Sequence, residues 1–234
     1  MNILVMLLIL FYSVSLYAIE PKMYIFFING VNTTADDANA HLEKLEDLMN
    51  YESNTITWNV LYNATHGLIK SDLIDFMKQK YKDDFPGRNL DDIVNQFNNK
   101  FKGDKNNVYI LIIAHSQGNN YANQLYAYLV HREHFPADRV GIFSIASPAH
   151  SIDGFVNPDS RFKYVTADND RIINLVNSMP GYKPMPANVH LHDCKDFVCH
   201  GLVTSYLFDK EVSKDICKGI KSYITLWLNE YPVC

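Results

Sequence analysis

The sequence predicts an α/β fold, in which a mostly parallel β-sheet carries helices on both faces. One observation is that strand-like and helix-like segments alternate along the chain, as they do in proteins with a parallel sheet. Another is the run VYILII over residues 108–113, whose continuous apolar and branched character is typical of a strand buried on both faces. The 234 residues are enough for one hydrophobic core of this kind. We therefore expect a single domain with right-handed crossovers between its strands.

The first half of the chain supplies two strands and three helices. Residues 23–28 form an apolar, aromatic and branched run that ends at the turn Asn29-Gly30, which predicts a buried strand. Residues 32–34 are good N-caps for a helix over residues 35–50, where Ala40, Leu42, Leu45 and Leu48 keep helical spacing. A strand over 55–62 and helices over 68–81 and 90–101 follow, with Pro86-Gly87 between the two helices.

The second half of the chain begins with the central strand and continues the alternation. A helix is expected over residues 119–130, directly after that strand. Further strands are expected over 140–145 and 162–166, with a short one over 189–191. The chain closes with helical segments over 202–208 and 212–228.

The N-terminal segment is typical of a secretory signal peptide. Residues 1–18 contain no charged side chain, and an apolar block over residues 3–11 is followed by small or polar residues at Ser13, Ser15 and Ala18. The polar interruptions leave the block too short to span a bilayer, which needs roughly 20 apolar residues. We therefore expect cleavage near Ala18, export, a mature domain over residues 19–234, and no membrane span in the mature chain.

All four cysteines lie in the last quarter of the chain, at positions 194, 199, 217 and 234. An even number in an exported protein suggests two disulfides, and three pairings are possible. The sequential pairing would close a short loop at Cys194 and Cys199 and would tie Cys234 to the last helix. In that arrangement the Cys217–Cys234 bridge would contribute about 3 kcal/mol by loop closure. Four free thiols are the alternative, while a zinc site is not expected because the spacing lacks paired CxxC motifs.

Charge and composition exclude several classes of protein. The formal net charge is −5, and no run of Lys or Arg offers a basic surface for phosphates, so nucleic acid is not an expected partner. With 47% hydrophobic and 20% charged residues, the chain is not of the disordered class.

The segment 113–119, Ile-Ala-His-Ser-Gln-Gly-Asn, joins the central strand to the following helix through a serine. A serine in such a tight turn has a strained backbone, so the residues two before and two after it must be small. Ala114 and Gly118 meet this need. The turn raises the Ser116 hydroxyl above the carboxyl end of the sheet and directs the helix N-terminus at any oxyanion formed beside it.

On these residues the sequence resembles the α/β-hydrolase superfamily, whose nucleophile elbow is usually G-x-S-x-G and here reads Ala114-x-Ser116-x-Gly118. Alanine replaces the first glycine. The resemblance covers roughly residues 22–228 and implies a compact α/β-hydrolase fold. Only about 50 residues separate the strand ending at Ile145 from His200, and two strands and a loop must come from them. No large helical cap is therefore expected.

The superfamily order of nucleophile, acid and histidine implies a base near the C-terminus. His200 opens a helical stretch that resembles the catalytic-histidine loop of the superfamily, so we expect it to be the base. His190 and His192 remain alternatives. The histidines set aside are His131 and His134, at the end of the elbow helix, and His150, which precedes any acid loop.

The acid is expected after the strand over 162–166, where two carboxylates compete. In the superfamily the acid commonly precedes a short apolar pair, and Asp170 matches this pattern better than Asp168, which remains the alternative. The residue that is not the acid is expected to cap the turn or to pair with Arg171.

The oxyanion hole requires two backbone N–H groups. One is expected from Gln117, the residue after the nucleophile, and the other from Val31 in the loop after the first strand, with Asn32 as the alternative. Asn32 and Asn63 also begin N-glycosylation sequons, but such triplets are frequent by chance, and a glycan on Asn32 would crowd the site.

The resemblance implies a serine hydrolase that forms an acyl-enzyme and needs no metal or organic cofactor. The elbow residues and the turn over 146–148, Ala-Ser-Pro, look like those of lipases and esterases, which favours a small-molecule or lipid acyl ester as substrate. The helices between residues 68 and 101 are candidates for a lid. Thioester or peptide cleavage by the same residues remains an alternative, as does a catalytically silent binding protein of the same fold.

Overall fold

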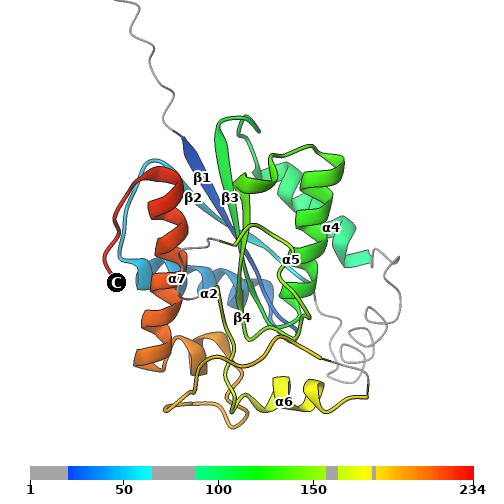
Figure 1. Ribbon diagram of the computed structural model, residues 1–234, viewed down its shortest axis with the longest axis vertical. Coiled ribbons are helices and arrows are strands. Elements are labelled where there is room, and N and C mark those ends of the chain that lie inside the picture. The colour runs from blue at the N-terminus through cyan, green and yellow to red at the C-terminus, as the bar shows by residue number, and fades with distance from the viewer. Residues whose placement is uncertain (1–20, 65–87, 157–162, 181–182) are drawn as a thin grey trace, which may run out of the picture.

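The computed structural model describes residues 21–64, 88–156, 163–180 and 183–234 (Figure 1). Its centre is a five-stranded sheet in the order β2-β1-β3-β4-β5, and every neighbouring pair is parallel. Helices cover both faces, so the predicted α/β class and compact α/β-hydrolase-like architecture are confirmed. The predicted signal peptide, the helix over 68–81 and the Pro86-Gly87 break lie outside the described residues.

The three inner strands are buried along nearly their whole length, which explains their uninterrupted apolar sequences. They are β1 (Lys22–Ile28), β3 (Val108–His115) and β4 (Val140–Ile145). β3 runs two residues further than expected, so Ala114 and His115 are still paired with β4. The edges are formed by β2 (Ile56–Leu61) and β5 (Tyr164–Val165).

The strand predicted over residues 189–191 is wrong. Only an isolated bridge joins Val189 to Ala167. The cause is Asn188, whose side chain takes hydrogen-bonding positions that a neighbouring strand would occupy. Its Oδ1 accepts the Thr166 N–H at 2.9 Å, and its Nδ2 donates to the Tyr164 carbonyl at 2.7 Å. The sheet therefore ends at β5, which is also shorter than the strand predicted over 162–166.

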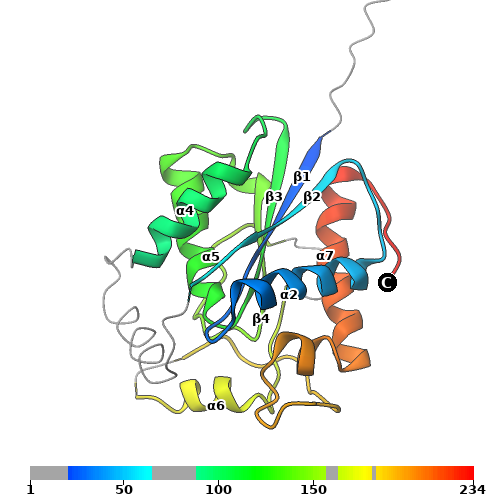
Figure 2. The same ribbon diagram turned by 180° about the vertical axis from the view of Figure 1, so that it is seen from behind.

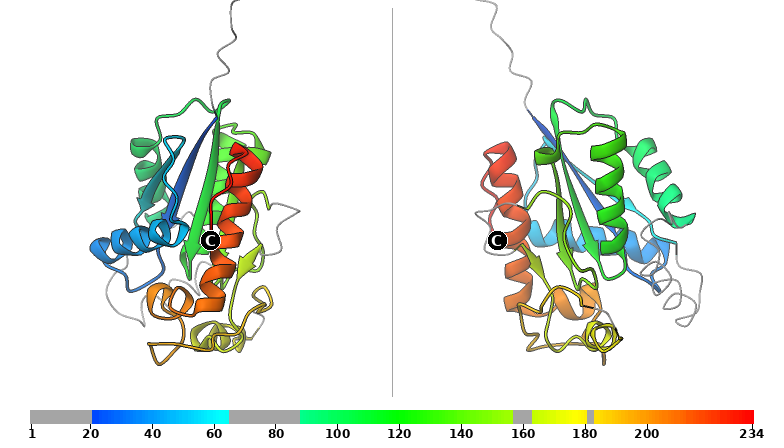
Figure 3. Two further views of the ribbon diagram at one scale, coloured as in Figure 1. Left: turned by 90° about the vertical axis from the view of Figure 1, so that its left-hand side faces the viewer. Right: turned by 45° about the vertical axis from the view of Figure 1, so that its right-hand side comes forward.

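Helices pack on both faces of the sheet (Figure 3). α2 (Ala35–Met49) and α7 (Lys210–Leu228) pack with Phe27, Ile113 and Phe143 in one apolar cluster. α4 (Arg88–Lys100) and α5 (Gly118–Ala127) belong to the cluster on the other face. α2 begins where expected, because Thr34 and Asp37 form a reciprocal capping box.

α4 is a core helix, so the expectation that it is part of a lid is wrong. Its Ile93 and Phe97 are buried, and the Phe97 ring lies 5.0 Å from that of Phe26 in β1. Gln96 also binds the main chain just beyond the end of β2, because its amide accepts the Tyr62 N–H at 2.8 Å and donates to the Tyr62 carbonyl at 2.9 Å. Movement of α4 would expose the apolar core and break these hydrogen bonds.

The described segments between β4 and α7 are mostly irregular and lie at the carboxyl edge of the sheet (Figure 2). They include α6 (Arg171–Asn177), which was not predicted as a helix, and a π-helical turn over Leu202–Tyr206. A second π-helical turn, Tyr128–Arg132, extends α5.

Two disulfides join Cys194 to Cys199 and Cys217 to Cys234. This is the sequential pairing among the three possible ones. Disulfides persist in oxidising compartments, so they fit a protein that acts outside the cytosol. Among the described residues, no helix combines the length and the hydropathy needed to cross a bilayer.

Candidate active site

Ser116 lies in the tight turn between β3 and α5, at the carboxyl edge of the sheet. Its φ is 55°, in the left-handed region, as expected for a strained elbow. The turn is held from both sides, since the Ser116 N–H donates to the Ile145 carbonyl at 3.1 Å and Asn119 Nδ2 donates to the Ser116 carbonyl at 2.9 Å. A Cβ at Gly118 would lie 2.5 Å from the Ile28 carbonyl oxygen, so only glycine fits there.

The structure brings together the three residues expected to perform the chemistry. His200 Nε2 lies 2.8 Å from Ser116 Oγ, and His200 Nδ1 lies 2.7 Å from Asp170 Oδ2. Both distances are within hydrogen-bond reach. With the proton on Nδ1, the imidazole donates to the carboxylate and accepts from the serine hydroxyl. This is the arrangement that a general base needs.

Asp170 is fully buried, and four donors satisfy its carboxylate. Oδ1 accepts the N–H groups of Ile172 and Ile173, each at 3.0 Å, so that Asp170 caps the N-terminus of α6. Oδ2 accepts from the Tyr206 hydroxyl at 2.9 Å in addition to His200. Burial and the negative charge of Asp170 raise the pKa of Tyr206 well above its ordinary value, so the hydroxyl keeps its proton and acts as a donor.

His115 supports the base from the elbow side and was missed by sequence reasoning. Its Nε2 lies 2.9 Å from the carbonyl oxygen of His200. Burial and the neighbouring His200 hold the pKa of His115 well below its ordinary value, so the ring is neutral. A neutral ring that donates through Nε2 fits this contact. The available signal was only its position next to Ser116, which does not reveal a partner 85 residues away.

The alternative acid and base residues pair with each other outside this arrangement. Asp168 Oδ1 lies 2.6 Å from His190 Nδ1, and both side chains are more than half exposed. The His192 ring packs against that of His190 at 5.2 Å. Asp168 does not pair with Arg171 as expected, because the Arg171 guanidinium lies over the Phe197 ring at 4.1 Å.

The loop after β1 passes directly over Ser116. A Cβ at Gly30 would lie 2.6 Å from Ser116 Cβ and 3.2 Å from Ser116 Oγ, so glycine is required for this approach. Val31 follows this point of contact, and Asn32, the alternative residue, is exposed with a φ of 54°. Gln117 precedes the first residue of α5. The two amides proposed for an oxyanion hole therefore belong to segments that meet at Ser116.

Buried amide side chains join these two segments to the end of β2. Asn63 Nδ2 donates to Gln117 Oε1 at 3.1 Å, while the Asn63 N–H donates to Asn29 Oδ1 at 2.9 Å. Asn29 Nδ2 in turn donates to the Gly30 carbonyl at 2.8 Å. The sequence predicts only a turn at Asn29 and a sequon at Asn63, and gives no sign of this link between them. Because Asn63 is fully buried, its sequon is not available for a glycan in the folded protein.

No group of three or more potential metal ligands occurs in the part of the chain that the structure describes. No protein-family model matches the chain, and neither does any curated protein. Among solved structures, a cutinase-like protein from Cryptococcus sp. matches with 13% sequence identity and a TM-score of 0.43, over 87% of this chain and 94% of that chain. At this TM-score the likeness has no bearing on function.

Proposed function

We propose that the protein is a serine hydrolase that cleaves carboxylic esters through an acyl-enzyme. The observation that carries this proposal is the continuous hydrogen-bond chain from Ser116 Oγ through the His200 imidazole to the buried carboxylate of Asp170. Nucleophile, base and orienting acid in mutual contact are the arrangement that activates a serine hydroxyl.

Each residue then has a defined role in the reaction. His200 Nε2 takes the hydroxyl proton as Ser116 Oγ attacks the acyl carbonyl, and Asp170 stabilises the imidazolium that forms. The imidazolium returns the proton to the departing alkoxide. A water molecule, deprotonated by His200 in the same way, then releases the acid from Ser116.

The developing oxyanion is bound by the backbone N–H groups of Gln117 and Val31. Support comes from the close approach of Gly30 to Ser116 and from the start of α5 at Gly118, whose dipole favours negative charge at this point. The buried amides of Asn29 and Asn63 hold both segments in place.

Oxygen esters, lipid esters included, are the proposed substrates, because the elbow residues and the Ala146-Ser147-Pro148 turn resemble those of lipases and esterases. Thioesters and peptides are the alternative for the same residues. We further propose that residues 1–18 direct export and that residues 19–234 form the mature domain. The two disulfides are consistent with that location.

Labelling with a fluorophosphonate probe tests the proposal. The purified mature protein should be labelled, whereas folded Ser116→Ala and His200→Ala variants should not be. Ser147→Ala is a matched control, because Ser147 follows the neighbouring strand β4 and is also buried, and this variant should still be labelled. A folded wild-type protein that stays unlabelled would contradict the hydrolase and favour a silent binding protein.

Substrate class is tested separately on matched acyl compounds. Rates on an oxoester, a thioester and an anilide with the same acyl chain should be highest for the oxoester. An ester chain-length series, measured below and above the solubility limit, tests the lipid version. Equal rates across the series and no response to an interface would contradict it.

A further inference from the structure

Asp196 lies four residues before His200 and is surrounded by hydrogen-bond donors. Its Oδ1 accepts the N–H groups of Val198 at 3.2 Å and His200 at 3.1 Å. Its Oδ2 accepts the Gly201 N–H at 3.2 Å and the Thr204 hydroxyl at 2.7 Å, together with the Ser205 hydroxyl. One carboxylate therefore binds the backbone on both sides of the His200 side chain.

The carboxylate is ionised at all pH values at which an esterase would work. Burial acts to raise the pKa of Asp196, but the hydrogen bonds from Ser205, Thr204 and the backbone of His200 and Gly201 outweigh it and lower the pKa to about 2. Charge-assisted hydrogen bonds of this kind are stronger than neutral ones. The segment around His200 therefore closes around a fixed negative charge.

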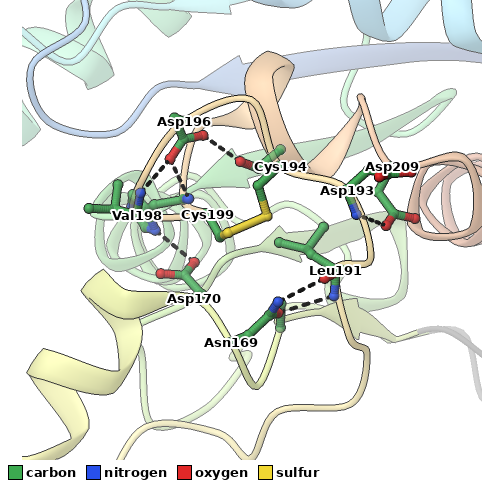
Figure 4. The surroundings of a disulfide bond; sticks show 12 residues. Asn169, Asp170, Leu191, Asp193, Cys194, Asp196, Val198, Cys199 and Asp209 are labelled. Atoms are coloured by element: carbon green, nitrogen blue, oxygen red, sulfur yellow. Dashed lines mark hydrogen bonds and ion pairs between the residues drawn. A yellow bond between two sulfur atoms is a disulfide. The ribbon is translucent and has the colours of Figure 1, made fainter.

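The surrounding covalent structure places this charge within a small ring (Figure 4). The Cys194–Cys199 disulfide closes the ring that contains Asp196, and the ring ends one residue before His200. The Lys195 N–H donates to the Thr204 carbonyl at 2.8 Å, and the Arg171 N–H donates to the Val198 carbonyl at 3.0 Å. The second contact joins the ring to the residue that follows Asp170, so base and acid share one support.

We propose that Asp196 is a positioning residue for His200, whose backbone it fixes so that the imidazole reaches Ser116 and Asp170 at the same time. This inference rests on the proposed function of Ser116, His200 and Asp170. Asp196 touches neither the reacting serine nor the acid, and it acts through the main chain of His200 and Gly201. No regular strand or α-helix holds that main chain, since His200 precedes the π-helical turn at Leu202.

An amide cannot replace this carboxylate. Both oxygens of Asp196 face donors only, so an asparagine in the same position would direct its NH₂ group at one of the two donor sets. Either the N–H groups of Val198 and His200 or the N–H of Gly201 would then lose their acceptor, because only the Thr204 and Ser205 hydroxyls can accept from the NH₂ group. Asp196→Asn therefore releases one side of the loop with almost no change in side-chain volume.

Asp209 is a matched control for that variant. Its buried carboxylate also accepts several backbone N–H groups, at 2.6 Å from His192, 3.1 Å from Asp193, 2.9 Å from Glu211 and 3.0 Å from Val212. Its pKa is also lowered, with burial acting in the opposite sense to these hydrogen bonds. Asp209 holds the same connecting segment to α7 through Asp193 (Figure 4), and its carboxylate makes no hydrogen bond to His200 or Gly201. Asp209→Asn therefore loses comparable hydrogen bonds away from the base.

The test compares Asp196→Asn and Asp209→Asn with the wild type in ester hydrolysis. We expect kcat of Asp196→Asn to fall about 10- to 100-fold, the size of effect that a misplaced catalytic group produces, with KM changed less than about 3-fold. Asp209→Asn should keep kcat within about 2-fold while losing as much stability to urea. Equal kcat values for all three proteins, or equal losses in the two variants, would overturn the proposal.

A proton NMR measurement at low temperature separates this proposal from the function on which it rests. In the wild type the His200 Nδ1–H bound to Asp170 should give a far-downfield signal, which Asp196→Asn should weaken or broaden and Asp209→Asn should retain. An unchanged signal in Asp196→Asn overturns the positioning role even if no ester is hydrolysed. An inactive wild type with the signal present would instead contradict only the proposed reaction.

A second variant covers the case in which Asp196→Asn does not fold. Ser205→Ala removes one donor to Oδ2 and leaves the carboxylate and the His200 N–H in place. We expect kcat to fall about 3-fold with the same downfield signal broadened. Full activity with a sharp signal would count against Asp196 as the support of the base.

Discussion

The serine and the histidine of the site are held by different kinds of structure. Ser116 lies between the central strand β3 and helix α5, and the residues on either side of it are 6% exposed. His200 lies in a segment with little regular structure, where side-chain carboxylates, a disulfide and the His115 ring supply the contacts. The proposed nucleophile is thus positioned by backbone pairing and core packing, whereas the proposed base is positioned by side chains that reach the main chain.

Because of this difference, different kinds of substitution should have the largest effect in the two regions. Around Ser116 almost any added atom meets backbone, as the 2.5 Å approach to the Ile28 oxygen at Gly118 shows. Around His200 an added Cβ at Gly201 would meet the side chains of Thr204 and Asp196 rather than backbone, and each polar partner holds part of the loop. Steric changes should therefore matter most at the elbow, and loss of polar groups should matter most at the base.

The largest effect is expected from the reacting groups themselves. Ser116→Ala and Asp170→Asn should each lower kcat/KM by about 10⁴-fold, because the nucleophile or the orientation of the base is lost. Their stabilities should differ. Ser116→Ala should stay within about 0.5 kcal/mol of the wild type in urea unfolding, since its main chain is held by neighbours.

Asp170→Asn should lose about 1–2 kcal/mol, because an amide has a single acceptor oxygen and cannot accept from all four donors as the carboxylate does. Equal stabilities of the two variants would contradict the proposed contrast, in which backbone pairing holds Ser116 and side-chain hydrogen bonds hold Asp170 and His200.

The second largest effect is expected at Gly30. Gly30→Ala places a Cβ 2.6 Å from Ser116 Cβ, so the loop that carries Val31 must move away from the serine. We expect kcat to fall about 100-fold, as for the loss of one oxyanion donor. Gly141→Ala is the control, because its Cβ would meet the Tyr223 and Trp227 rings at 2.7 and 2.8 Å, away from the site.

The control should lose about 1–3 kcal/mol of stability by overpacking and keep its kcat. Assays of kcat beside urea titrations distinguish the two variants. A Gly30→Ala enzyme with normal kcat would show that this loop does not support the oxyanion.

The same difference explains what the sequence could predict. β1, β3, β4 and the elbow were predictable because burial on both faces and a serine between small residues leave local patterns. Ser116, Asp170 and His200 were predictable because the sequence resembles a superfamily in which nucleophile, acid and histidine follow one another in this order. The structure brings them together through loops whose course depends on contacts across tens of residues, such as His115 with His200.

The errors have the same origin. The strand over 189–191 fails because the Asn188 side chain takes its hydrogen bonds, and α6 is not predicted because Asp170 both caps this helix and contacts His200, two roles that the sequence divides between Asp168 and Asp170. α4 has the amphipathic pattern of either a lid or a core helix, and only the structure shows that Ile93 and Phe97 face the sheet. Local periodicity does not determine which surface an apolar face covers.

The two disulfides should give a moderate effect that differs by region. Cys194→Ser/Cys199→Ser opens the ring before His200 and should lower kcat about 10-fold, with a stability loss of about 2 kcal/mol from the short loop. Cys217→Ser/Cys234→Ser frees the C-terminal tail from α7 and should lose about 3 kcal/mol with kcat unchanged.

Kinetics and urea unfolding of the two double variants, with mass analysis to confirm the remaining bridge, test this expectation. A fall in kcat of equal size in both would mean that the effect is one of general stability.

The smallest effect is expected from acidic pH. It tests whether the hydrogen bonds that hold the main chain of His200 depend on an ionised carboxylate. The pKa of Asp196 is about 2 in the folded protein, against 3.8 as its ordinary value. The unfolded chain therefore binds the proton more readily, so this carboxylate stabilises the fold above pH 4, and the contribution is lost as the pH falls from about 4 to about 2. Because the side chain is partly exposed, solvent screening limits the contribution to about 1 kcal/mol.

The difference in urea stability between wild type and Asp196→Asn should accordingly be constant from pH 7 to 5 and shrink below pH 4. If the difference stayed constant down to pH 3, the loop would be held by neutral hydrogen bonds and packing, as the elbow is, and the two regions would not differ in the way proposed.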